Sequence, residues 1–145
     1  MTLREKIAAV LLTLTAVVYG VIPLIVDISP THILHPAWTA HARFHVVWQL
    51  ALNSMLALLA VLLIWWPGTT RSLRLKIGAL LGCIALGGFV IAAVTRHLYG
   101  GDFTEPGGVP PVGGIDANVL AFTPTIVIQI IALALALWPK RAASV

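Results

Sequence analysis

The sequence predicts an all-α, polytopic membrane protein folded as a bundle of four transmembrane helices. Hydrophobic residues make up 59% of the 145 residues and charged residues only 10%, whereas soluble domains carry about 25% charged residues. The mean hydropathy is +0.99. The apolar residues form four runs, each near the roughly 20 residues that a helix needs to cross a bilayer. We therefore expect residues 1–145 to form a single transmembrane domain.

Each apolar run is expected to be one span. The spans are predicted at residues 7–26, 46–66, 77–95 and 118–138. The first run is longer than the roughly 7–15 apolar residues of a signal peptide, so we expect it to be retained. Gly78 and Gly82 form G-x-x-x-G, which lets helix backbones approach closely in lipid. Pro23 and Pro124 each remove a backbone donor and are expected to kink the first and fourth spans.

The basic residues predict the orientation in the membrane. Lys and Arg in short loops mark the cytoplasmic side. Seven of the nine fall on the side of the two termini: Arg4, Lys6, Arg71, Arg74, Lys76, Lys140 and Arg141. Arg43 and Arg96 fall on the other side, together with all five histidines. We therefore expect both termini in the cytoplasm and the protein in the inner cell membrane.

A ladder of polar side chains enters the second span. His41, His45, Gln49 and Asn53 follow one another at intervals of four residues, which places them along one side of a helix. Asn53 lies about 12 Å below His45, and Gln129 lies at a similar depth in the fourth span. Gln49, Asn53 and Gln129 are therefore predicted to bind a cofactor in a polar funnel that opens outward. The alternative is that Asn53 and Gln129 hold the bundle together by interhelical hydrogen bonds.

His41 and His45 can hold one metal ion from a single helix face. Catalytic zinc commonly takes three protein ligands and keeps one position open, and His35 and His97 are expected to complete the set. The other candidate donors are His32, Asp27, Asp102, Glu105 and Asp116. Zinc, iron or copper would suit such a site. The histidines could equally be interfacial polar residues, hydrogen-bonding core residues, or acid–base groups without metal.

The two outer loops differ in character. In residues 29–34, Ser29 can cap a helix and Pro30 can take its first position, so we expect a short interfacial helix there. Pro36 disfavours its continuation through His35. Residues 100–116 are rich in glycine and proline, and Phe103 favours a lid that docks on the bundle over a free tether.

The segment Pro36–His45 reads P-x-W-x-x-H-A-R-F-H. Together with the four-span layout, it resembles a group of small bacterial and fungal integral membrane proteins that form a family of unknown function. The resemblance implies the same architecture. It carries no activity.

Three functions fit these features. An enzyme would use His41, His45 and Asp27 to act on a small lipophilic substrate, with metal-assisted oxidation, hydrolysis or isomerisation as the reaction. A non-enzymatic protein would bind a lipid, a quinone or a metal, or serve as a small subunit of a membrane complex. A purely structural role would leave the histidines incidental. Membrane lipids and further copies of the chain are compatible partners, and nucleic acid is not expected, because the basic residues form no patch.

Overall fold

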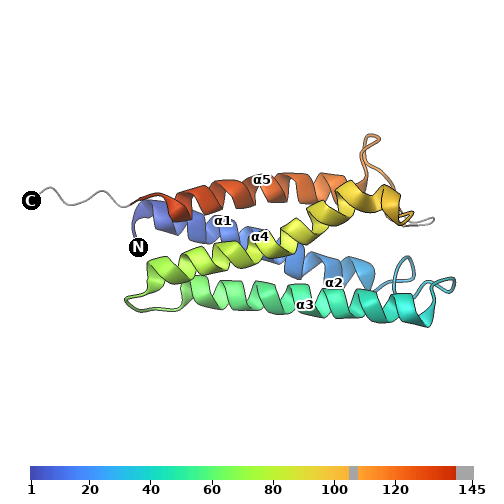
Figure 1. The fold of residues 1–145 in the computed structure, drawn as a ribbon, viewed down its shortest axis with the longest axis horizontal. Coiled ribbons are helices and arrows are strands. Elements are labelled where there is room, and N and C mark those ends of the chain that lie inside the picture. Colours follow the sequence, from blue (N-terminus) through green and yellow to red (C-terminus); the bar gives the residue numbers. More distant parts are fainter. Residues whose placement is uncertain (105–107, 140–145) are drawn as a thin grey trace, which may run out of the picture.

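The computed structural model describes residues 1–104 and 108–139. Four long helical segments lie side by side (Figure 1). The elements are α1 (Leu3–Gly20), α2 (Ile22–Asp27), α3 (Ala40–Trp65), α4 (Arg71–Thr95), the 3₁₀ turn η1 (Arg96–Leu98) and α5 (Ala117–Leu137). The segments α1–α2, α3, α4–η1 and α5 are each long and apolar enough to cross a membrane. The predicted all-α fold is thus confirmed, and the described residues contain four helical segments that are long and apolar enough to cross a membrane.

The second and third helices begin earlier than the apolar runs. α3 starts at Ala40 and α4 at Arg71, where the expected spans began at residues 46 and 77. Hydropathy marks only the part of a helix that suits hydrocarbon, whereas backbone hydrogen bonding continues until a cap ends it. Thr39 caps α3, since its hydroxyl accepts from the Ala42 N–H at 3.2 Å. As a result, His41 and His45 lie in the first two turns of α3.

The first span is broken near its end. α1 ends at Gly20 and α2 begins at Ile22, with Pro23 in the first turn of α2. Proline has no N–H to donate to the carbonyl four residues earlier, here that of Tyr19. The interruption at Val21 agrees with the predicted kink. Pro124, in contrast, lies inside α5, which continues through it.

Residues 28–39 contain turns in place of the expected interfacial helix, so that prediction is wrong. The Leu34 N–H donates to the Ser29 carbonyl at 3.0 Å, and the His35 N–H donates to the His32 carbonyl at 2.8 Å. The Ser29 hydroxyl lies 2.8 Å from the Thr31 hydroxyl and caps no helix. Such local side-chain bonding competes with helix formation in short segments.

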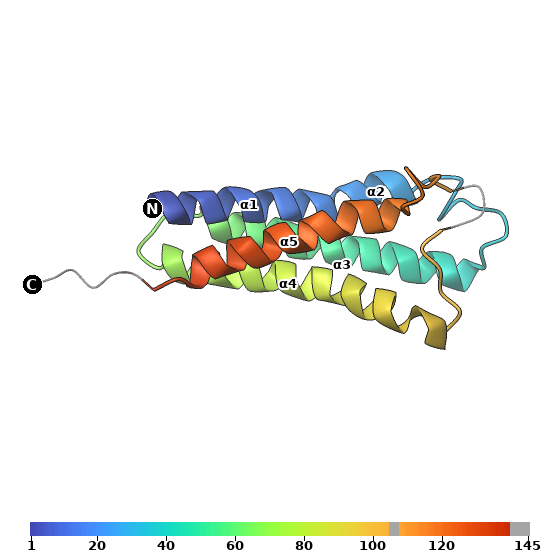
Figure 2. The ribbon, with the colours of Figure 1, turned by 90° about the horizontal axis from the view of Figure 1, so that it is seen from above.

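The two ends of the bundle carry different segments. The start of α1, the end of α5 and the α3–α4 connection lie at one end, which we call the terminal end (Figures 1 and 2). There the Arg4 Nη1 donates to the Pro139 carbonyl at 3.3 Å. The opposite end, which we call the loop end, carries residues 28–39 and the segment between η1 and α5.

The core is concentrated toward the terminal end. Its main cluster contains Ala8, Ala9, Leu12, Ile64, Leu75, Ala79, Ala132 and Ala136. A second cluster contains Ala16, Tyr19, Ala57 and Leu86. Nearer the loop end, α2 buries no residue, and the buried positions of α4 stop at Leu86. Toward that end α4 also runs away from α2 (Figure 2), so the helices pack more loosely there.

Glycines allow α4 to pack closely against its neighbours. A Cβ atom added at Gly78 would lie 2.8 Å from Ile64 Cγ1 of α3, and one at Gly82 would lie 2.6 Å from Gln129 Nε2 of α5. Real Cβ atoms essentially never make contacts this short, so a side chain at either position would force Ile64 or Gln129 to shift. The close approach of helix backbones predicted from G-x-x-x-G is confirmed at Gly78, where the added Cβ would lie 3.2 Å from the Ala60 carbonyl oxygen, whereas the space at Gly82 is filled by the Gln129 side chain.

Candidate functional site

The two histidines at the start of α3 lie together. Their Nε2 atoms are 3.0 Å apart, and their ring centroids are 4.4 Å apart. Both side chains are exposed. Within residues 1–104 and 108–139, no third His, Cys, Asp or Glu joins His41 and His45 in a possible metal site. Glu105, one of the candidate donors, lies outside the described residues.

The other two predicted metal ligands have separate surroundings. The Nδ1 atom of His35 accepts from the Ala37 N–H at 3.2 Å. The His35 carbonyl accepts from Arg43 Nη2 at 2.8 Å, so Arg43 ties residues 28–39 to α3. His97 is exposed in η1, at the end of α4. Its role as a metal ligand remains a prediction, as does that of His35.

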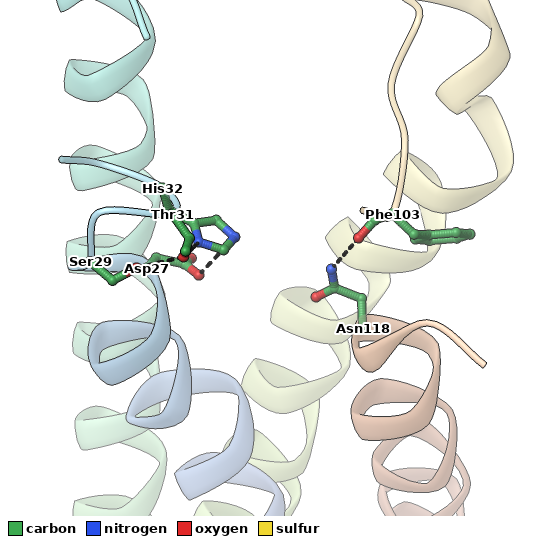
Figure 3. A network of polar contacts seen from close by, with 6 residues as sticks. All are labelled: Asp27, Ser29, Thr31, His32, Phe103 and Asn118. Carbon is green, nitrogen blue, oxygen red and sulfur yellow. Dashed lines mark hydrogen bonds and ion pairs between the residues drawn. The ribbon is translucent and has the colours of Figure 1, made fainter. Parts of the chain in front are cut away.

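Asp27, expected to act with His41 and His45, has a different histidine beside it. Figure 3 shows this polar group at the end of α2. The Oδ1 of Asp27 lies 3.9 Å from His32 Nε2, and the two side chains are 27% and 22% exposed. The other ring nitrogen of His32 lies 2.9 Å from the Thr31 hydroxyl. This pairing fixes the His32 ring at both nitrogens.

The polar ladder winds around α3. Four residues exceed one helical turn of 3.6, so each step rotates by about 40°. His41, His45 and Gln49 are exposed, whereas Asn53 is half-buried. The ladder therefore passes from the exposed side of the helix toward the core. Gln49 and Asn53 remain predicted cofactor-binding residues, but only Gln49 lies on the exposed side with the histidines, while Asn53 lies closer to the core.

Gln129 is the centre of a buried polar network near the middle of the bundle. It is 2% exposed, and its Oε1 accepts from the Thr15 hydroxyl at 2.7 Å. Its Nε2 donates to the Ala79 carbonyl at 2.7 Å and lies 3.6 Å from Cys83 Sγ. The network joins α1, α4 and α5. The partner of Gln129 is thus Thr15, and the proposed bond to Asn53 is not formed.

Replacing Asn53 with leucine should change the free energy of unfolding by less than about 0.5 kcal/mol, because the Asn53 side chain has no hydrogen bond within the described chain. Thr15→Val should destabilise the protein by about 0.6–1.7 kcal/mol, the range for interhelical hydrogen bonds in membranes. Unfolding by a denaturing detergent measures both. A larger loss for Asn53→Leu than for Thr15→Val would contradict this assignment.

A small cavity of about 170 Å³ lies at the loop end of α4. Its lining combines apolar and polar side chains: Phe89, Ala92, Ala93, Arg96, Tyr99, Asp102, Phe103 and Asn118. The Arg96 guanidinium carbon lies 4.8 Å from the centre of the Phe103 ring. Asn118 Nδ2 donates to the Phe103 carbonyl at 2.8 Å (Figure 3). Phe103 thus docks on the bundle, as expected for this loop.

Aromatic rings connect this cavity with the second core cluster. Phe89 stacks on Phe122 with a centroid distance of 4.4 Å and an interplanar angle of 19°. Phe122 packs against the cluster that contains Tyr19. Sequence reasoning did not single out Phe89, Arg96 or Asn118 as site residues. Helical spacing could have indicated that these side chains lie together, since Phe89, Ala93 and Arg96 occupy the i, i+4 and i+7 positions of one helix face.

Tyr19 carries an unsatisfied hydroxyl. Its side chain is 2% exposed, and in the described part of the chain its hydroxyl oxygen has no hydrogen-bond partner. Such groups are rare in native structures and call for an explanation. The hydroxyl therefore marks a point where a water molecule or a polar ligand atom would be stabilised.

Comparison with known families matches residues 11–141 to DUF6640, a family of unknown function. The chain belongs to the DUF6640 family. The matched range contains α3, α4 and α5 and most of α1. No curated protein and no solved structure matches the chain. Membership of DUF6640 therefore assigns no activity to the chain.

Proposed function

We propose that this DUF6640 protein binds a small amphiphilic molecule with an anionic head group at the loop end of its bundle. The observation that carries the proposal is the composition of the α4 cavity, where a guanidinium and a carboxamide share about 170 Å³ with phenyl rings. The Asp102 carboxylate also lines this cavity, and its Oδ1 accepts from the Phe103 N–H at 2.6 Å. That the chain is a multi-pass membrane protein follows from its four apolar spans.

Arg96 is suited to hold the head group. A guanidinium presents five N–H donors in a planar fork that matches carboxylate and phosphate. One of its nitrogens, Nη1, donates to the Ala93 carbonyl at 2.7 Å, and the Phe103 ring supports its face. The remaining donors are available to a ligand. Asn118 adds a side-chain oxygen that can accept a hydrogen bond.

The size of the cavity limits what enters it. Pockets for drug-sized ligands measure roughly 300–1,000 Å³, so about 170 Å³ admits a head group or a very small molecule. A longer apolar tail would lie outside the cavity, along α4 and in the lipid. Membrane lipids and other lipophilic acids combine an anionic head group with such an apolar tail.

Binding is favoured over catalysis because the proposed catalytic groups have separate partners. Asp27 faces His32 at 3.9 Å, whereas His41 and His45 approach each other. A general base and its orienting carboxylate need to be within hydrogen-bond reach. Ligand binding in the α4 cavity does not require a general base to be paired with a carboxylate.

Ligand binding tests the proposal. The purified protein is titrated with dodecyl phosphate and, as a neutral control, with dodecyl maltoside of the same chain length. We expect Arg96→Ala to weaken binding of the phosphate about 10-fold or more, since a charged hydrogen bond contributes about 1.5–3 kcal/mol. Arg43→Ala, at the same end of the bundle but outside the cavity, is the matched control. Equal binding of both amphiphiles, or an equal loss in both variants, would refute the proposal.

The orientation proposed for this site places the loop end outside the cell membrane and both termini in the cytoplasm. The support is the charge bias of seven basic residues against two. A reporter that works only in the cytoplasm should be active when fused after Val145. A reporter that works only outside the cytoplasm should be active when inserted at Gly108. The reverse pattern would place the cavity on the cytoplasmic side.

A further inference from the structure

We infer that His41 and His45 form half of a metal site, which the same two histidines of a second copy of the chain complete. The site would contain four imidazoles around one zinc-like ion on a two-fold axis. This inference is independent of the α4 cavity, because His41 and His45 lie on α3 and do not line that cavity. It commits to a homodimer as the partner.

The geometry of the pair suits chelation. Zinc–nitrogen bonds measure about 2.0–2.1 Å, so two ligand nitrogens in a tetrahedral site lie about 3–3.5 Å apart. The Nε2 atoms of His41 and His45 are 3.0 Å apart. In the metal-free pair the two nitrogens are within hydrogen-bond distance of each other, and a metal ion would replace this hydrogen bond. A shift of a few tenths of an ångström would accommodate the ion.

Neighbouring aromatic side chains contact the His45 ring, which in turn contacts His41. Trp48 stacks beside His45 with an interplanar angle of 25° and a centroid distance of 6.0 Å. Phe44 meets the same imidazole edge to face at 5.7 Å. Rings positioned before the metal arrives lose less conformational entropy on binding. These contacts favour the observed position of the His45 ring before metal binds.

The number of ligands points to a second copy. A closed zinc site takes four ligands, and the described part of one chain offers two at this point. In a two-fold symmetric dimer each residue occurs twice at the interface, so His41 and His45 supply four. The same symmetry completes the tetrahedron without a further residue type.

The surface around the pair is open to a second α3 helix. His41 and His45 are exposed, and Phe44 and Trp48 are 62% and 58% exposed. A groove of about 370 Å³ runs beside them, lined by Phe44, Val47, Trp48 and Ala51. Imidazoles that face lipid are costly in free energy, and metal ligation between two copies would remove them from it.

Metal titration of the full chain tests the inference. The protein is purified in detergent, stripped with EDTA and titrated with Co²⁺ or Zn²⁺, while light scattering reports its mass. We expect one metal ion per two chains, the visible absorption of tetrahedral Co²⁺, and a dimer that EDTA converts to monomers. His41→Ala and His45→Ala should each weaken binding by at least about 100-fold, because loss of an outer-shell partner alone costs about 10–100-fold.

His97→Ala separates this site from the one predicted within a single chain, in which exposed His97 would be a ligand, and in the inferred dimer it should bind metal as the parent does. Without metal, the variants should have the same free energy of unfolding as the metal-free parent, because the replaced side chains are exposed. One ion per monomer would overturn the inference and point to a ligand from the same chain, such as Glu105. No binding, or equal losses in His97→Ala and His41→Ala, would overturn it too.

Discussion

Replacing Gly82 with alanine should destabilise the bundle by about 2–4 kcal/mol. The new Cβ would lie 2.6–2.9 Å from the carboxamide atoms of Gln129, so this buried amide would have to move. Overpacking of this kind costs about 1–3 kcal/mol. Loss of a hydrogen bond from Gln129 to Thr15 or Ala79 adds about 0.6–1.7 kcal/mol. Unfolding by a denaturing detergent, followed by circular dichroism, measures the change.

The same helix provides the controls. Cβ atoms added at Gly87 and Gly88 would have no neighbour within 4 Å. Gly87→Ala and Gly88→Ala should therefore be neutral or stabilising by up to about 1 kcal/mol, through helix propensity. In a Gln129→Ala background, Gly82→Ala should cost less than about 1 kcal/mol, because the clashing amide is gone. A Gly82→Ala effect that is unchanged in this background would show that Gln129 is not the cause.

Tyr19→Phe should raise the free energy of unfolding by about 1–3 kcal/mol in ligand-free protein. The substitution keeps the ring, which packs in the second core cluster, and removes a buried hydroxyl that has no partner in the described chain. An unsatisfied buried polar group costs about 1–3 kcal/mol. Detergent unfolding of the parent and the variant measures the gain.

Tyr99→Phe is the control for this prediction. The Tyr99 hydroxyl donates to the Ala92 carbonyl at 2.7 Å, so its removal should lower stability by about 0.5–1.5 kcal/mol. The two substitutions are chemically the same and should act in opposite directions. A loss of stability in Tyr19→Phe would mean that its hydroxyl has a bound partner in the purified protein.

The class of the protein and its four helices could be predicted from the sequence because long apolar runs have few alternatives in a membrane. Helix ends were less predictable. The start of α3 at Ala40 depends on the Thr39 cap, which hydropathy does not register. Residues 29–34 have helix-start signals, but the Ser29 hydroxyl bonds Thr31 and the chain forms turns.

In the candidate site, contacts between residues close in sequence could be predicted, whereas contacts between distant residues could not. The approach of His41 to His45 could be predicted, because i+4 neighbours meet on any α-helix. The hydrogen-bond partner of Gln129 could not be predicted from depth in the membrane alone, since Thr15 and Asn53 lie at similar depths. The rotation of each helix about its axis determines that Thr15, and not Asn53, faces Gln129. The α4 cavity depends on how the segment after η1 folds back, and single-chain periodicity carries no information on that.

The four helices differ in length, and the extra turns of α3 carry its histidines toward the edge of the hydrocarbon layer. α5 has 21 residues and α3 has 26, or about 32 and 39 Å at 1.5 Å per residue, while the hydrocarbon layer is about 30 Å thick. Counted from Trp65, His45 lies about 30 Å along α3, and His41 lies one turn beyond. The histidine pair would thus lie at the hydrocarbon boundary, where a thicker membrane would draw it into the acyl chains and a thinner one would leave it among head groups.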